Sequence, residues 1–377
     1  MGTLQGLYSA LRRPRRHGPI GVELSLSQFN LVQLRRARGQ LAIAAHGSAP
    51  CDGAGNMLDE NPQALQQALR TALAQGPFRG RTAVAAMPSS LVRVMPLTYH
   101  TSPDVSRDQA IAGLMQERIG DALDDYVLDY LPVENRGNSR QNLALVALCR
   151  KELVLSYLDL LRRSGLQVET LEIGPIAIRR LVTEVQRHAD GGNVLVVNTG
   201  RDKSYLTLVA DGRLLSDEEV SFGENQVLEH AARVLDLESD SVLDTILNAN
   251  LDPGRWQDDG DKDGDAMLAE VLRPSLAALV AEIRRALLFA SSESSGGVRN
   301  EVYLMGALGR WPGAEAFLGE LLQVPVRKMP NPFVAAGASP ELMTPGRMHM
   351  PPELAIACGL ALHGYEPAVT AALDSAA

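Results

Sequence analysis

Apolar and polar residues follow a strand-turn-strand pattern across Val194–Gly223. Val194–Val197 is an uninterrupted apolar run of the kind that forms a buried strand. Turn-forming residues break this run at Asn198–Gly200, and Tyr205–Val209 resumes as a second strand rich in β-forming residues. A tight turn of this type gathers backbone N–H groups, here those of residues 201–204, into a concave cluster that can hold a phosphate.

The same pattern occurs once more, near the start of the chain. Ile20–Ser25 runs into a turn, Phe29–Leu34 returns, and Leu41–Ala45 follows as a third strand. When Glu23 is placed against Asn198, Ser25 falls against Gly200 and Leu31 against Leu206. Two such units far apart in one chain predict a duplicated fold with a cleft between its halves.

The spacing of apolar residues predicts alternating helices and strands in the rest of the chain. Residues 61–75, for example, place Leu65, Leu69 and Ala72 at helical spacing behind Pro62. Because strand-length apolar runs separate such helices, we predict an α/β protein. The other predicted helices are 104–123, 151–164, 175–188, 224–235, 239–248, 266–291, 313–322 and 354–363, and the other predicted strands are two within 81–95 and one each at 126–131, 142–149, 166–173 and 301–305.

Composition excludes several classes of function. The 377 residues carry a formal net charge of −9 and 4% aromatic residues, so we expect no nucleic-acid binding, which needs a basic face or stacking platforms. The three cysteines are far apart, which favours reduced thiols in a cytoplasmic protein over disulfides or a metal site. Uncharged apolar runs are all well short of the roughly 20 residues of a membrane-spanning helix.

Residues 1–18 combine apolar residues at helical spacing, such as Leu4, Leu7 and Leu11, with four arginines. One interpretation is a short amphipathic helix in peripheral contact with an anionic inner-membrane surface. The other is a basic tail, or a helix packed on the body of the protein. Three leucines bury little area, so the second interpretation is preferred.

An acidic stretch fits the EF-hand calcium-loop expression from Asp259 to Glu270, with oxygen ligands at the required spacing and Gly264 at the sharp turn. However, Ala266 stands where a branched apolar residue usually pairs with a second loop, and turn-forming residues precede the stretch instead of an entering helix. We therefore expect an acidic loop and no calcium site.

Several segments, taken in order, resemble the PilM family of type IV pilus assembly proteins, which share the actin-like fold of FtsA and include the proteins called MshI. The two hairpin units resemble the family's two phosphate hairpins. The closing segment LAIACGLAL, residues 354–362, resembles the family's last helix. The further matching segments are residues 145–178 at the end of the insertion subdomain that FtsA and PilM share, 220–223 after the second hairpin, and 302–326 with 331–333 at the nucleotide base.

The resemblance implies a two-lobed, actin-like (ASKHA) α/β fold with an FtsA/PilM-type insertion subdomain. On that basis we predict the following division: a basic N-terminal tail at 1–18, a first lobe at 19–80 plus 175–193, an insertion subdomain at 81–174, a second lobe at 194–366 with its helical subdomain at 224–300, and a C-terminal tail at 367–377.

The chain departs from the family pattern at the phosphate hairpins. Glu23 and Asn198 replace aspartates, and Ser25 replaces a turn glycine. Asn30 replaces a phosphate-contacting lysine, and Ala307 follows Gly306 in place of a second glycine. Glutamate would displace a hydrated Mg²⁺ by one methylene, and asparagine is neither a general base nor an anionic metal ligand. We therefore expect no ATP hydrolysis, while binding of ATP with Mg²⁺ stays open.

The resemblance also assigns candidate cofactor-binding residues, with no catalytic residue and no metal ligand among them. Glu282 and Arg285 are placed on a helix that faces the ribose in the family, although a solvated helix face is the preferred interpretation. The complete set is Glu23, Ser25, Ser27, Asn198, Gly200, Lys203, Ser204, Gly223, Glu282, Arg285 and Gly306.

PilM proteins bind the N-terminal cytoplasmic peptide of PilN, a single-pass inner-membrane partner, in a groove between the first lobe and the insertion subdomain. The resemblance therefore implies a scaffold at the cytoplasmic face of the inner membrane. The apolar residues expected at the groove are Met87, Leu91, Val94, Met95 and Ile176, although core packing is an alternative for each.

Two other functions are compatible with the same fold. One is an FtsA-like polymer with active ATP binding, and the other is a small-molecule kinase. A kinase needs a carboxylate base and a metal-binding carboxylate at the cleft, and Asn198 occupies one of those places. The altered phosphate hairpins favour the divergent MshI branch of the family over PilM proper.

Overall fold

The computed structural model describes residues 17–25, 27–37, 40–51, 58, 61–101, 104–133, 142–187, 192–256, 263–293, 300–333 and 351–365. The predicted C-terminal tail, all but two residues of the predicted N-terminal tail, and residues 259–262 of the acidic stretch lie outside these ranges. No helix among the described residues is both long enough and apolar enough to cross a membrane.

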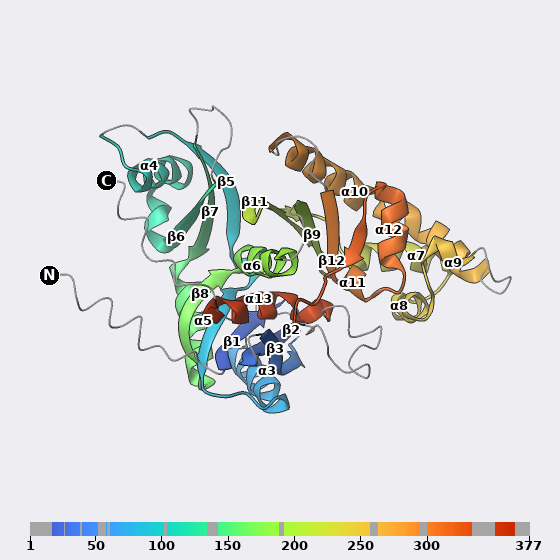
Figure 1. The fold of residues 1–377 in the computed structure, drawn as a ribbon, viewed down its shortest axis with the longest axis horizontal. Helices are drawn as coiled ribbons and strands as arrows, with labels where there is room; N and C mark the ends of the chain where they lie inside the picture. The colour runs from blue at the N-terminus through green and yellow to red at the C-terminus, as the bar shows by residue number, and fades with distance from the viewer. Residues whose placement is uncertain are drawn as a thin grey trace.

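Two five-stranded sheets form the centres of two lobes (Figure 1). In each sheet the first three strands of the lobe pair antiparallel, and the last two add in parallel on the other side of its first strand. The first sheet has the order β3-β2-β1-β4-β8, with β1 His17–Leu24, β2 Gln28–Ala37, β3 Gln40–Pro50, β4 Thr82–Met87 and β8 Gln167–Ile173. The second has the order β11-β10-β9-β12-β13, with β9 Asn193–Thr199, β10 Ser204–Ala210, β11 Arg213–Val220, β12 Asn300–Gly306 and β13 Val326–Lys328.

The predicted duplication is confirmed at the level of single residue pairs. Glu23 lies opposite Asn30 in the first hairpin, and Asn198 lies opposite Tyr205 in the second. The next pair inward is Val22 with Leu31 in one hairpin and Val197 with Leu206 in the other. The two turns therefore have the same length, as the alignment of Glu23 with Asn198 predicted.

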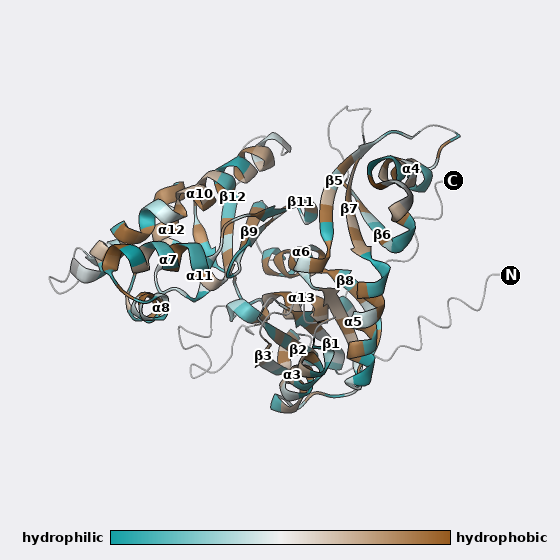
Figure 2. Ribbon diagram, turned by 180° about the vertical axis from the view of Figure 1, so that it is seen from behind, coloured by the Kyte–Doolittle hydropathy of each residue, from teal (hydrophilic) through white to brown (hydrophobic). Residues whose placement is uncertain are grey.

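Two helices lie between the sheets, α6 (Gly174–Gln186) and α13 (Ala355–Leu362) (Figure 1). Every residue of α13 is buried, and it is among the most apolar helices of the ribbon (Figure 2). Glycines permit its close approach to both neighbours: a Cβ on Gly21 of β1 would lie 2.0 Å from Ala357 O, and a Cβ on Gly359 would lie 2.1 Å from Ala177 O. Although we expected this terminal helix in the second lobe, it also packs against the first-lobe strands β1, β2 and β4.

The first-lobe sheet is covered on its outer side by α3 (Pro62–Gln75) and α5 (Lys151–Arg163), which share one apolar core with β1 and β2. Asn61 caps α3 by accepting a hydrogen bond from Ala64 N, and Pro62 occupies the first turn, where its missing N–H costs nothing. We expected β4, α5 and β8 within the insertion subdomain. Their pairing and packing place them in the first lobe and narrow the insertion to the chain between β4 and α5.

The insertion subdomain is a three-stranded sheet in the order β5-β7-β6 with one helix packed on it. A capping box at Ser106 and Gln109 starts that helix, and Gly120, with φ of 72°, ends it earlier than predicted. The strands are β5 Arg93–Tyr99, β6 Tyr126–Val133 and β7 Asn142–Arg150, and the helical segments are η1 Ser89–Leu91, α4 Arg107–Ile119 and η2 Gly120–Asp125.

Helices on the outer side of the second-lobe sheet complete that lobe (Figure 1). The longest, α10 (Asp263–Glu293), contains Pro274 and packs against β9, β10 and α7 (Glu224–Leu235). The others are α7 Glu224–Leu235, α8 Ser239–Asn248, α9 Pro253–Trp256, α11 Ala307–Arg310 and α12 Ala314–Leu322, and short turns η5 Pro352–Leu354 and η6 His363–Tyr365 flank α13.

Candidate functional site

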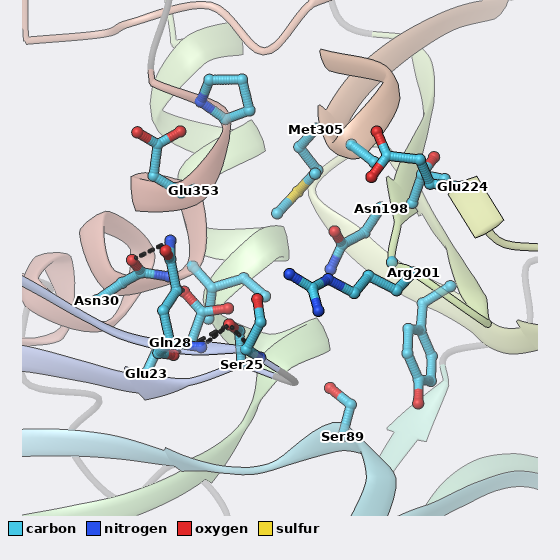
Figure 3. Close-up of a pocket in the computed structure, with 18 of the residues that line it drawn as sticks. Glu23, Ser25, Gln28, Asn30, Ser89, Asn198, Arg201, Glu224, Met305 and Glu353 are labelled. Atoms are coloured by element: carbon cyan, nitrogen blue, oxygen red, sulfur yellow. Dashed lines mark hydrogen bonds between the residues drawn. The ribbon is translucent and has the colours of Figure 1, made fainter. Parts of the chain in front are cut away.

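A cavity of about 580 Å³ lies between the lobes, where the turns of the two equivalent hairpins face each other (Figure 3). Among the residues that line it are six of the predicted cofactor-binding residues: Glu23, Ser25, Ser27, Asn198, Gly200 and Gly306.

The turn of the first hairpin is closed by Ser25. Its backbone N–H donates to Gln28 O at 2.9 Å, and its hydroxyl donates to the same carbonyl at 3.0 Å. The hydroxyl also accepts from Gln28 N at 3.2 Å and from Ser27 N at 3.5 Å. Because the Ser25 hydroxyl accepts hydrogen bonds from N–H groups that a glycine at this position would leave free, the first hairpin has few backbone donors left for a phosphate.

Glu23 is held within a network of neutral side chains. Asn30 Nδ2 donates to Glu23 Oε2 at 3.2 Å, and Asn30 Oδ1 accepts from Gln28 Nε2 at 2.8 Å and from Ser48 Oγ at 2.9 Å. The Glu23 side chain is 8% exposed. Burial raises the pKa of this carboxyl group to about 8, and Glu353 nearby contributes in the same direction. The group is therefore largely protonated at neutral pH.

The turn of the second hairpin presents a cation to the cavity. Gly200 N donates to Lys203 O at 2.9 Å and closes the turn. The Arg201 side chain extends from this turn toward the first-lobe hairpin, with its guanidinium between Asn198 and Ser25 (Figure 3). Lys203, the cation that we predicted here, does not line the cavity and pairs with Glu219 at 2.5 Å. The sequence did not identify Arg201, because the direction in which a turn side chain points is set by the folded geometry of the turn, and the sequence alone does not give that geometry.

Two other predicted residues support the second turn without lining the cavity. Ser204 is fully buried and donates to Phe222 O at 2.8 Å. A Cβ on Gly223 would lie 2.2 Å from Arg201 O, so only glycine allows the backbone at residue 223 to lie this close to the second turn. The start of α7 follows, where Glu224 N donates to Gly200 O at 3.0 Å and fixes the turn against the helix.

Glu282 and Arg285 do not line the cavity. They pair with each other at 2.6 Å on α10, and Arg285 also pairs with Glu218 of β11 at 2.6 Å. The side chain of Arg285 is 59% exposed. This arrangement corresponds to the solvated helix face that we preferred for these residues.

A buried carboxylate at the start of α7 was missed by the sequence analysis. Glu224 is 4% exposed and accepts hydrogen bonds from Arg310 at 3.0 Å and from Trp311 Nε1 at 3.0 Å. Beyond it the cavity is lined by Leu228 and Leu243, which give this end an apolar surface. The cavity therefore has a polar end at the hairpins and a mixed end at α7 and α8.

The two equivalent hairpin positions do not fit a magnesium ion. Mg²⁺ prefers carboxylate oxygens in an octahedral arrangement, whereas Glu23 is buried beside an amide and Asn198 is uncharged. The described residues contain no group of three or more His, Cys, Asp or Glu side chains suited to a metal. In the acidic stretch, α10 begins at Asp263, so the second half of the EF-hand match is helical where a calcium loop would still be turning.

A second cavity, of about 670 Å³, lies between the first lobe and the insertion subdomain, where we expected a partner groove. Met87, Leu91 and Val94 line it, whereas Met95 and Ile176 do not. Val94 and Met95 are neighbours on β5, so their side chains point to opposite faces of the sheet, and Met95 packs in the insertion core. Ile176 packs against the core between the lobes instead.

The second lobe supplies one wall of this cavity, which the sequence analysis did not anticipate. Asp217 and Glu219 of β11 and Tyr205 of β10 line it opposite β5. Thr207 donates to Asp217 at 2.6 Å, while burial raises the pKa of that carboxyl group to about 7. The two cavities are adjacent, because residues such as Met87, Ser89 and Tyr205 line both.

Comparison with known proteins identifies relatives of the whole fold. The family profile described as "Type IV pilus assembly protein PilM" matches residues 21–365. The structure of a PilM–PilN type IV pilus biogenesis complex matches with a TM-score of 0.71 and 24% identity, covering 93% of this chain and 100% of that chain. The ethanolamine utilization protein EutJ from Carboxydothermus hydrogenoformans matches with a TM-score of 0.50 and 13% identity, covering 93% and 91%. These likenesses show the actin-like ATPase fold.

Proposed function

Since this chain belongs to the PilM family of type IV pilus assembly proteins, we propose that it is the actin-like scaffold of a pilus assembly platform and binds the N-terminal peptide of a PilN-like membrane protein. The observation that carries the proposal is the cavity of about 670 Å³ between the first lobe and the insertion subdomain. A solved relative of the same fold is a PilM–PilN complex, which supports the choice of partner.

The walls of this cavity suit an extended peptide. Half-buried apolar side chains, Leu91 and Val94, form one wall, and the acidic side chains of Asp217 and Glu219 form another. β5 is an edge strand of the insertion sheet, so part of its backbone is unpaired beside the cavity. Apolar pockets beside an open strand edge are a recurring means of peptide recognition.

The proposed location is the cytoplasmic face of the inner membrane, where a PilN-like protein presents its N-terminal peptide. Residues 1–16, with four arginines, would add a peripheral contact with anionic lipid. We also propose that the chain is nearer to the MshI branch than to PilM proper, which the altered hairpins support. We further propose that the cleft between the lobes still binds ATP but does not hydrolyse it, because neither Glu23 nor Asn198 offers an ionised carboxylate.

Peptide titration tests the proposed partner. A synthetic peptide of the PilN N-terminus should bind the full chain with a defined stoichiometry in isothermal titration. Val94→Arg introduces a charge into the cavity and should weaken binding by at least about tenfold. Leu155→Arg is the matched control, since Leu155 is 67% exposed on α5 and does not line the cavity. Absence of peptide binding, or equal loss in both variants, would refute the assignment.

A further inference from the structure

The cleft between the lobes has no ionised carboxylate at its two equivalent hairpin positions, Glu23 and Asn198, and it contains a cation of its own. Two arginines line it, Arg201 and Arg310. Arg310 is neutralised by Glu224, at 3.0 Å. Arg201 makes no ion pair with any other described residue, and its guanidinium points to the middle of the cavity (Figure 3).

We propose that this cleft binds the polyphosphate chain of a nucleotide without a divalent metal, with the Arg201 guanidinium in the place of the cation. This inference rests on the proposed retention of ATP by the cleft. A guanidinium suits this role because its planar array of N–H donors matches two phosphate oxygens at once and its charge is permanent.

The first-lobe side of the cleft supports a metal-free arrangement. Glu23 stands on β1 at the end nearest the turn, equivalent to Asn198 on β9. The Glu23 carboxyl group is enclosed with Asn30, and burial keeps it largely protonated at neutral pH. A neutral acid neither attracts a divalent cation nor repels a phosphate. The two equivalent positions are therefore both uncharged.

Two acidic side chains limit the expected affinity. Asp240 lines the cavity from α8, and Glu353 lines it from η5, away from Arg201 in Figure 3. Since the first hairpin also has its N–H groups occupied by Ser25, one arginine carries most of the attraction. We therefore expect dissociation constants in the high micromolar to millimolar range, corresponding to about 4–6 kcal/mol.

The test is a titration of the full chain with a fluorescent ATP analogue, in EDTA and in excess Mg²⁺. The affinity should agree within about twofold between the two conditions. Arg201→Gln should weaken binding by about tenfold or more in EDTA, since it removes a charge-assisted contact. Lys203→Gln, two residues further along the same loop, should leave affinity unchanged because Lys203 pairs with Glu219 away from the cavity. An unchanged melting temperature verifies that each variant is folded.

Competition identifies the part of the nucleotide that is recognised. Tripolyphosphate should displace the analogue from the native chain and lose this ability in Arg201→Gln, whereas adenosine should compete weakly. Binding that requires Mg²⁺, an unaffected Arg201→Gln, or adenosine competing as well as ATP would overturn the inference while ATP retention stands. Failure to bind under both conditions would refute retention itself, and the metal-free inference with it.

Discussion

Asn30 Nδ2 lies 3.2 Å from Glu23 Oε2, so an amide on β2 donates a hydrogen bond to a carboxyl group buried on β1. The pKa of that carboxyl group is raised to about 8, mainly by burial. The folded state therefore holds a proton that the unfolded chain, with an ordinary pKa of 4.5, has already lost at neutral pH. The contribution of Glu23 to the free energy of unfolding therefore falls as the pH rises from about 4.5 to 8.

Glu23→Gln should remove this dependence, because glutamine resembles the protonated acid in shape and still accepts from Asn30. We expect the variant to be more stable than the native chain at pH 8, by about 2–4 kcal/mol, and nearly equal at pH 5. Urea unfolding at the two pH values measures the difference. Glu229→Gln, on the exposed face of α7, is the control and should show no such trend. A native-minus-variant difference that does not change with pH would contradict the assignment.

Ser25→Gly should increase the affinity of the cleft for polyphosphate. Ser25 Oγ accepts from the backbone N–H of Gln28, and removing it frees that donor for a ligand. One additional hydrogen bond corresponds to an increase of about three- to tenfold. The fluorescent-nucleotide titration measures it, with Ser90→Gly as the control because Ser90 lines the same cavity from another segment. Equal effects of the two substitutions would mean that the hairpin N–H groups are not involved.

A buried ion-pair network joins the first lobe to the helices between the lobes. Arg180 of α6 donates to both oxygens of Glu172 on β8, at 2.9 and 3.1 Å, and to Gly359 O on α13 at 2.9 Å. His363 Nδ1 lies 2.7 Å from the same carboxylate. Burial alone would raise the pKa of Glu172, but hydrogen bonds from His363 and Arg180 outweigh it and lower the pKa below 4.5. Stability from Glu172 is thus present above pH 4.5 and is lost as the pH falls through this lowered pKa.

Arg180→Met should be strongly destabilising, because it leaves the buried Glu172 carboxylate without its main partner. We expect a loss of about 3–5 kcal/mol at pH 7 in urea unfolding. The matched control is Arg163→Met, which removes an exposed pair with Asp159 on α5 and should cause no measurable change. A small loss of stability in Arg180→Met would contradict this expectation, and it would show that water takes the place of the guanidinium as the partner of Glu172.

The local sequence pattern was sufficient to predict both hairpins, because two strands that are joined by a tight turn pair with each other. The equivalence of Glu23 and Asn198 followed directly. Parallel pairing was less predictable. The chain between β1 and β4 includes α3, and the chain between β4 and β8 includes the insertion, although each pair lies side by side in the sheet. The lobe to which β4 and β8 belong is therefore set by partners far away in the sequence. The insertion boundary was misplaced for this reason.

Side-chain direction limited the prediction of the cleft. Arg201 and Lys203 are both cations in one turn, and only the folded turn separates the one that enters the cavity from the one that pairs with Glu219. Burial of Glu23 was equally hidden, because a charged residue near the end of a strand is normally exposed. The wall that β11 adds to the cavity between the first lobe and the insertion subdomain depends on how the lobes sit together, which no local pattern encodes.

Close backbone contacts at α13 provide the last prediction. A Cβ on Gly359 would lie 2.1 Å from Ala177 O, closer than any relaxed contact allows, and both helices are buried between two sheets. Gly359→Ala must therefore push α13 away from α6, and we expect a loss of about 1–3 kcal/mol or more in urea unfolding. Gly113→Ala is the matched control: Gly113 is exposed within α4, a Cβ there meets nothing within 4 Å, and alanine favours the helix by about 0.5–1 kcal/mol. The two substitutions should thus shift stability in opposite directions. Ile356 of α13 and Glu353 of the adjacent η5 line the cavity between the lobes. Gly359→Ala should therefore also weaken the proposed nucleotide binding, whereas Gly113→Ala should not.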